Sequence, residues 1–213
     1  MFRKYLRYLS FPDAVPSASD YAAYFSRLPV LETASLILRP MAKSDARDIF
    51  AYASDPEVAR YVLWEPHKNL RDTRAYIRYI RSLYRNGFPS SWAVVLRETG
   101  RVIGSIGFMW ASSENRSAEV GYSLSRQYWN HGYATEALSA VLDSAFHSLN
   151  LNRIEAQRDQ RNPASGRVME KSGMLLEGVL RSRLMNKGEF IDVSLYAVLR
   201  RDWEQKKVAE NRV

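Results

Sequence analysis

The stretch from Ala118 to Leu138, AEVGYSLSRQYWNHGYATEAL, changes from a strand pattern to a helix pattern within a few residues. Gly132 stands at the change, where a glycine allows the backbone to adopt a positive φ. A helix that begins directly after such a turn presents unpaired N–H groups and the positive end of its dipole. The stretch therefore predicts an anion site at this turn, of the kind that most often binds phosphate.

The rest of the chain alternates between the period of a strand and that of a helix. Strand-like runs occur at 35–41, in a hairpin over 91–110, and at 116–125, 153–159, 174–185 and 189–200. Helical patterns occur at 43–54, 55–62, 70–87, 134–149 and 162–173, and a short helix capped by Ser19 or Asp20 is expected within 17–28. This order predicts an α/β fold with a mixed sheet of about seven strands flanked by helices.

The composition limits what the chain can do. Its 213 residues suffice for one domain with a sizeable core, and its formal net charge of +8 at pH 7 attracts anionic ligands. The absence of cysteine excludes disulfides, thiolate metal sites and a cysteine nucleophile, and the three histidines are too scattered to indicate a metal site. The chain has no signal-peptide pattern and no apolar run of about 18 residues, so we expect a soluble cytoplasmic protein.

Three common motifs of nucleotide binding and hydrolysis are absent: GxxxxGK[ST], GxGxxG and GxSxG. If the turn at Gly132 binds phosphate, it does so with backbone amides and without a dedicated lysine. Such a site suits a diphosphate that is held in place and not transferred.

Two runs of sequence resemble a known family. EVGYSLSRQYWNHGYATEAL (119–138), followed by NPASGRVMEKSGM (162–174), is similar to the GNAT acyl-CoA N-acetyltransferases, and specifically to the branch that acetylates ribosomal-protein N-termini. The similarity runs in order from about Leu31 to about Trp203. It implies a mostly antiparallel GNAT-type sheet, with an N-terminal extension (1–30), an acetyltransferase domain (31–204) and a charged C-terminal tail (205–213).

The resemblance implies acetyl-CoA as co-substrate and no metal. The family's pyrophosphate loop reads Q/R-x-x-G-x-G/A, and here Trp129 stands where Gln or Arg is usual and Asn130 where Gly is frequent. Asparagine tolerates left-handed backbone geometry better than most residues, so we expect the turn to keep its backbone conformation with Asn130. The residues expected to contact the cofactor are Ser123, Leu124, Ser125, Asn130, His131, Gly132, Tyr133, Ala134, Thr135, Asn162, Ser165 and Lys171.

The reaction implied by the resemblance is direct attack of a neutral amine on the thioester. The oxyanion is bound by a backbone N–H around Ser123 to Ser125, with Leu124 as our single choice. Glu119 stands on the same strand, where several family members carry a general base, and alternation puts it on one face with Gly121 and Ser123. The alternative is an ordinary solvent-facing or salt-bridged glutamate.

Asn162 and Ser165 open the helix that begins with NPAS. Asn162 before Pro163 has the pattern of an N-cap followed by proline at the first helical position. The resemblance adds a contact between Asn162 and the pantetheine arm, and a proton given by Ser165 to the leaving sulfur. Lys171 and Arg167 stand on the same helix, where they face either the 3′-phosphate of CoA or solvent.

The function implied is transfer of acetyl to a primary amine, the N-terminal α-amine of a (ribosomal) protein. A small-amine acetyltransferase, acting on a polyamine, an aminoglycoside or an amino acid, is one alternative, and a non-catalytic CoA- or ribosome-binding domain is another. Trp64, in WEPH, is expected to bind the acceptor together with Glu119, or else to anchor the core. The sequence leaves monomer and dimer open and predicts no membrane partner.

One helical segment carries a basic stripe. Arg71, Arg74, Arg78, Arg81 and Arg85 recur at steps of three and four, which places them on one side of a helix. The ordinary meaning of such a stripe is a solvated face. The alternative is a docking surface for an acidic partner, such as ribosomal RNA or an acidic protein.

Overall fold

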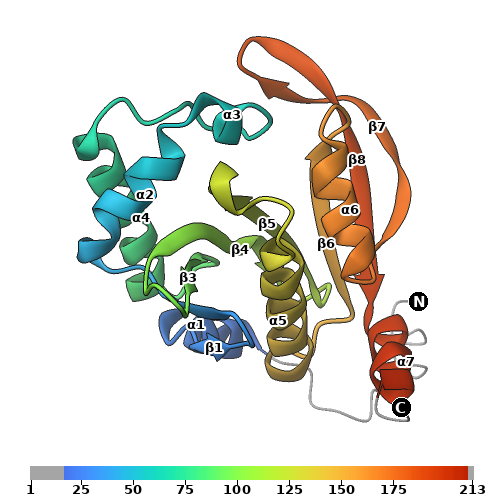
Figure 1. The fold of residues 1–213 in the computed structure, drawn as a ribbon. Coiled ribbons are helices and arrows are strands. Elements are labelled where there is room, and N and C mark those ends of the chain that lie inside the picture. The colour runs from blue at the N-terminus through green and yellow to red at the C-terminus, as the bar shows by residue number, and fades with distance from the viewer. Residues whose placement is uncertain (1–16, 211–213) are drawn as a thin grey trace, which may run out of the picture.

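The computed structural model describes residues 17–210 (Figure 1). The first 16 residues of the expected N-terminal extension and the last three of the expected tail lie outside the described residues.

One eight-stranded sheet runs through the molecule in the order β1-β2-β3-β4-β5-β6-β8-β7 (Figure 1). Its strands are β1 Leu31–Glu32, β2 Leu36–Pro40, β3 Ser91–Leu96, β4 Val102–Ser112, β5 Ser117–Leu124, β6 Arg153–Asp159, β7 Leu175–Asn186 and β8 Glu189–Leu199. All neighbours pair antiparallel except β5 and β6, which are parallel. The predicted mixed, mostly antiparallel sheet is confirmed, and the additional strand, β1, is too short to show a period of two.

Seven α-helices and two 3₁₀ turns occur in the described part of the chain. They are α1 Ala18–Ser26, η2 Lys43–Asp45, α2 Ala46–Ala53, α3 Pro56–Ala59, α4 Leu70–Asn86, η3 Arg126–Tyr128, α5 Tyr133–Ser148, α6 Pro163–Lys171 and α7 Arg200–Glu210. The predicted cap of α1 was wrong: Ser17 is the N-cap, and the Asp20 carboxylate accepts in return from the Ser17 N–H at 2.7 Å. Asp20 occupies the third helical position and its side chain bonds to the backbone of the N-cap. The two residues therefore form a capping box, which begins before Ser19.

Two hydrophobic clusters cover the two faces of the sheet. The larger one joins the sheet to α1, α5 and α6, and the smaller one joins it to α2 and α4. Strand β3 is buried along its whole length, because Trp92 and Val94 face the larger cluster while Ala93 and Val95 face the smaller one. Tyr21 and Phe25 of α1 are buried in the larger cluster, so this part of the extension packs into the main core.

Strands β5 and β6 separate partway along their length. Their parallel pairing covers only Ser117 to Glu119 of β5 and Arg153 to Glu155 of β6. Beyond Glu119, β5 continues beside β4 as far as Leu124, and β6 continues beside β8 as far as Asp159. A wedge therefore opens in the middle of the sheet, and helices α5 and α6 follow the two strands that border it (Figure 1).

Candidate active site

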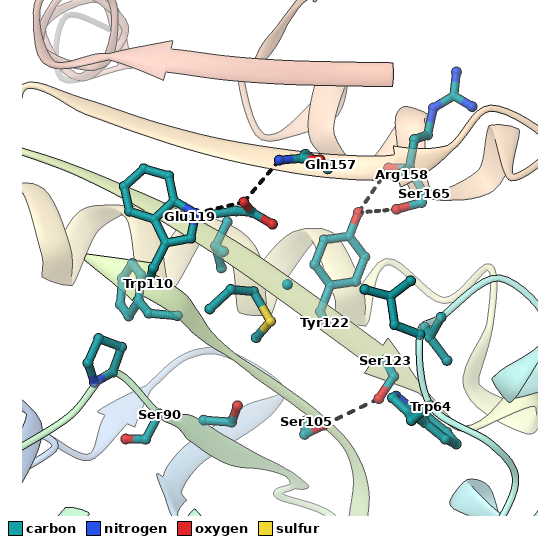
Figure 2. A pocket seen from close by; sticks show the side chains of 18 of the residues that line it. Trp64, Ser90, Ser105, Trp110, Glu119, Tyr122, Ser123, Gln157, Arg158 and Ser165 are labelled. Carbon is teal, nitrogen blue, oxygen red and sulfur yellow. Dashed lines mark hydrogen bonds between the residues drawn. The ribbon is translucent and has the colours of Figure 1, made fainter. Parts of the chain in front are cut away.

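A cavity of about 730 Å³ lies where the strands diverge. It is lined by the segment after α3, one side of α4 and the segment that follows it, parts of β4 and β5, the end of β6, one side of α6, and parts of β7 and β8. Three polar clusters stand out in Figure 2: Glu119 with Trp110 and Gln157, Tyr122 with Ser165, and Ser105 with Ser123. The cavity thus brings together segments that are more than 100 residues apart in the chain.

Strand β5 forms one wall of the cavity. Glu119, Gly121 and Ser123, which alternation predicts on one face, all line it. Strand β4 opposite carries a β-bulge between Phe108 and Trp110, so that Met109 is an extra residue beside Glu119. Bulges redirect side chains locally and occur often beside functional sites.

Glu119 is half-buried and points into this cavity (Figure 2). Its Oε2 accepts hydrogen bonds from Trp110 Nε1 at 2.8 Å and from Gln157 Nε2 at 3.0 Å. Burial raises the pKa of the Glu119 carboxyl above its ordinary value; the nearby Glu155 carboxylate also raises it, and the two hydrogen bonds oppose the shift. A carboxylate with a raised pKa, held by neutral donors in a cavity, has the properties of a general base.

The last residues of β5 present backbone donors on the side of the wedge. The Ser125 N–H donates to Ile103 O at 2.8 Å, toward β4, so the predicted contact through the Ser125 amide does not fit. Because successive N–H groups of a strand point to opposite sides, the Leu124 N–H is directed away from β4, to the side where β6 has diverged. The indole N–H of Trp129 fixes this segment by donating to Leu124 O at 2.8 Å. The unusual tryptophan of the loop therefore has a structural role.

The turn before α5 has the predicted left-handed geometry. Asn130 has φ 63° and Gly132 has φ 85°. A Cβ added at Gly132 would meet nothing within 4 Å, so the positive φ and not crowding explains the glycine. No side chain caps α5, and its first internal bond runs from Glu136 N–H to Gly132 O at 3.0 Å. The preceding amides, through Thr135, thus have no partner within the helix, as an anion site requires.

His131 lies at the rim of this turn. Its ring stacks on Tyr133, with centroids 5.7 Å apart and planes 7° apart, and its Nδ1 lies 2.8 Å from Trp129 O. The imidazole is exposed and does not line the cavity. Its geometry is that of a side chain that shapes the turn.

Helix α6 begins differently. The side chain of Asn162 accepts from the Ser165 N–H at 3.3 Å, so the predicted N-cap is confirmed. Ser165 Oγ lies 2.9 Å from the hydroxyl of Tyr122, which also donates to Ser165 O at 2.9 Å. Burial raises the pKa of Tyr122, so its phenol remains protonated at neutral pH. Sequence reasoning missed Tyr122, because alternation assigned it to the opposite face from Glu119.

Lys171 and Arg167 are exposed on α6 and do not line the cavity. Met169 is the residue that α6 adds to the lining besides Ser165. Both cations lie at the surface, a position that fits either alternative, a contact with the 3′-phosphate of CoA or with solvent.

The end of the cavity beside α4 is aromatic. Trp64 lines it and also packs against the smaller core cluster, with its ring 5.9 Å from that of His67, so it anchors the core, and acceptor binding by its ring stays a prediction. Sequence reasoning missed the other large side chains that line this end, including Tyr76, Tyr79, Leu83, Phe88 and Phe108. Ser90 lies among them, 1% exposed, with a hydroxyl that has no hydrogen-bond partner among the described residues.

The arginine stripe of α4 faces away from the cavity. Arg71, Arg74, Arg78 and Arg85 are exposed, whereas Arg81 is partly buried and donates to Met41 O at 3.0 Å. At about 100° per residue the arginines lie on the opposite side of the helix from the cavity-lining Tyr76, Tyr79 and Leu83. The stripe therefore cannot contact a ligand inside the cavity.

Residues 35–175 match the family model of the acetyltransferase (GNAT) domain, which is more than half of the chain. The chain belongs to the GNAT acetyltransferase family. It is 37% identical to the uncharacterized N-acetyltransferase p20 of Bacillus licheniformis, over 83% of this chain and 99% of that protein. It is 29% identical to the ribosomal-protein-serine acetyltransferase of Escherichia coli, over 59% of this chain and 69% of that enzyme. A GNAT acetyltransferase of Bacillus anthracis superimposes with a TM-score of 0.73 and 29% identity, over 81% of this chain and 99% of that one.

As a GNAT acetyltransferase, the protein uses acetyl-CoA as its acetyl donor. Residues 17–210 hold no group of three or more His, Asp or Glu side chains that could bind a metal ion. Over the same range, none of the helices has the length and apolarity needed to cross a bilayer.

Proposed function

We propose that this GNAT acetyltransferase transfers acetyl to the N-terminal α-amine of a protein. The observation that carries the proposal is the half-buried Glu119 carboxylate, which lies on the cavity wall at the point where β5 and β6 separate. The similarity to a ribosomal-protein-serine acetyltransferase supports a protein N-terminus as acceptor.

In the proposed reaction Glu119 accepts a proton from the acceptor ammonium group, and the neutral nitrogen attacks the thioester carbonyl carbon. The Leu124 N–H donates to the oxygen that becomes negative. The attacking nitrogen loses its second proton to solvent as the amide forms. When the carbon–sulfur bond breaks, Ser165 Oγ gives its proton to the leaving thiolate and recovers one from solvent. The amides of His131 to Thr135 hold the diphosphate, and Asn130 shapes their turn.

The acceptor amine sets how much the base contributes. An α-amine with a pKa of about 7.8 is roughly a quarter neutral at pH 7.4, whereas a lysine amine with a pKa of about 10.4 is about 0.1% neutral. We therefore expect Glu119→Gln to lower kcat/KM modestly for a peptide α-amine, and far more for any lysine amine. Because the pKa of Glu119 is raised, activity should rise with pH above the range in which glutamate ordinarily ionises, and Glu119→Gln should remove that limb.

The experiment that tests the proposal is acetyl-CoA turnover, followed by thiol release, on a panel of amines. The panel contains peptides with a free N-terminus, the same peptides with a blocked N-terminus and a free lysine, spermidine, and an aminoglycoside. Turnover restricted to free N-termini supports the proposal. Turnover on spermidine or the aminoglycoside would replace it with a small-amine acetyltransferase, and acetyl-CoA binding without turnover would favour a non-catalytic domain.

We extend the proposal to a docking surface for an acidic partner, formed by the four exposed arginines of α4. Since they face away from the cavity, an acidic partner such as ribosomal RNA would hold the enzyme near its protein substrate without entering the site. Replacing Arg71, Arg74, Arg78 and Arg85 by glutamine should weaken RNA binding and leave turnover of short peptides unchanged. Arg81 is left intact because it holds Met41 O. RNA binding that is unchanged in this variant would rule out the docking surface.

A further inference from the structure

The aromatic end of the cavity, where the proposed function places the acceptor, is lined mostly by apolar side chains. This restricts the chemical class of acceptor that can bind there. Six large side chains from four segments line this end: Leu63, Trp64, Tyr79, Phe88, Met109 and Trp110. The acidic residues that line the whole cavity are Glu119 and Asp159, and Asp159 is already engaged by Arg161 at 2.8 and 3.0 Å. A polycation would therefore pair with one carboxylate only, and its other charges would be desolvated against apolar side chains, which is unfavourable.

Several of these side chains remain exposed. Leu63 is 62% exposed, Tyr79 60%, Phe88 57% and Met109 55%, and all four border the same opening. Large apolar residues gathered at the mouth of a cavity lose contact with water only when a ligand covers them. The opening thus matches an apolar group on the acceptor.

The apolar wall begins directly at the proposed base. Trp110 donates its indole N–H to Glu119 Oε2 at 2.8 Å, so its ring stands beside the carboxylate. Met109 lies over Gly121, where an added Cβ would stand 3.4 Å from both Met109 Sδ and Cε. An amine placed at Glu119 therefore has these side chains around the carbon that carries it.

We infer that the acceptor amine is attached to a carbon that bears a large apolar group, preferably an aromatic one. The inference rests on the proposed function. For a protein acceptor it means a first residue such as phenylalanine, tyrosine, tryptophan, leucine or methionine, and not alanine or serine. Covering one such side chain favours binding by about 10- to 100-fold over alanine.

The inference is tested with peptides that differ only in their first residue: alanine, serine, leucine, phenylalanine or tryptophan. Ethylamine and 2-phenylethylamine form a matched pair of small amines. We measure kcat/KM by thiol release and, in parallel, peptide binding by calorimetry in the presence of CoA. The expected result is that phenylalanine and tryptophan exceed alanine and serine by about 10- to 100-fold in both measurements.

The outcomes separate the two proposals. Equal or better use of alanine or serine overturns the inference and leaves protein N-terminal acetylation intact. Turnover of 2-phenylethylamine without any peptide overturns the protein acceptor and supports the apolar one. If nothing is turned over, tighter binding of the phenylalanine peptide than of the alanine peptide still supports the inference, and equal binding overturns it.

Two variants locate the effect. Phe88→Ala removes a ring at the opening, whereas Phe190→Ala removes a ring that is similarly exposed, 67% against 57%, but does not line the cavity. Phe88→Ala should lower kcat/KM for the phenylalanine peptide by about fivefold or more and leave the alanine peptide nearly unchanged. Phe190→Ala should change neither. An equal loss for both peptides in Phe88→Ala would contradict the inference.

Discussion

Helices α5 and α6 both begin where a strand leaves the wedge, but their first N–H groups are satisfied differently. Helix α5 follows Gly132, at φ 85°, and no side chain caps it. Helix α6 follows Asn162, whose side chain accepts from the Ser165 N–H, and Pro163 in its first turn has no N–H to satisfy.

The difference separates two uses of a helix start. An uncapped start keeps its amides for an anion, at the expense of local stability. A capped start is stable by itself, and its side chains are free to take part in a reaction, as Ser165 does in the proposed mechanism. We therefore expect substitutions at α5 to act on acetyl-CoA binding, and substitutions at α6 to act on turnover or stability.

The largest effect is expected from a charge placed in the first turn of α5. Thr135→Asp puts a carboxylate beside the amides that are proposed to hold the diphosphate, and like charges at such a distance cost several kcal/mol. We expect acetyl-CoA to bind about 100-fold more weakly by calorimetry, with an unchanged or higher melting temperature, because an acid stabilises a helix start. Thr135→Asn has nearly the same shape without the charge and is the matched control. Equal affinity of the two variants for acetyl-CoA would show that the diphosphate does not bind at the start of α5.

The next effect concerns turnover at α6. Ser165→Ala removes the proposed proton donor, and we expect kcat to fall on the order of tenfold or more, since the CoA thiolate leaves with only modest help. The melting temperature should change little, because Tyr122 keeps its hydrogen bond to Ser165 O. Ser165→Thr retains a hydroxyl and should keep most of the activity. A kcat for Ser165→Ala equal to that of the unaltered enzyme would end the donor hypothesis.

The contrast between the two helix starts could be predicted in large part from the sequence. Gly132 and Asn162–Pro163 are local signals, and the long helices α4 and α5 carry the period and end signals that define them. Helix α7 was missed: residues 205–210 read as part of a charged tail, because their order comes from distant contacts. Trp203 and Lys207 both donate to the carboxylate of Asp143 in α5, at 2.6 and 2.8 Å.

The cavity itself could be predicted only in part. Glu119, Gly121 and Ser123 follow from alternation within one strand, so they could be placed on a common face. The separation of β5 from β6 depends on pairing between strands that no local pattern encodes. The aromatic end draws on segments from Leu63 to Trp110, each with an ordinary core pattern, and only the fold shows that they share a wall.

A smaller effect is expected from the backbone of the α5 turn. Gly132→Ala forces a residue with a side chain to φ 85°, which costs about 1–2 kcal/mol, although the added Cβ has space. We expect acetyl-CoA affinity to fall about tenfold, and less in Gly132→Asn, because asparagine tolerates this geometry. Calorimetry checks the affinity and thermal unfolding checks the fold. If Gly132→Ala binds as tightly as the unaltered protein, the left-handed turn is not what arranges the amides.

The smallest effect tests the cap of α6. Asn162→Ala removes the acceptor for the Ser165 N–H and should lower the free energy of unfolding by about 1 kcal/mol in denaturant titrations. Asn162→Asp keeps a capping oxygen and should keep the stability, but it replaces the amide that is proposed to contact the pantetheine arm. Weaker acetyl-CoA binding in a stable Asn162→Asp variant would show that this residue serves both the helix and the ligand. Unchanged binding would leave it only the cap and would make the contrast with the uncapped start of α5 complete.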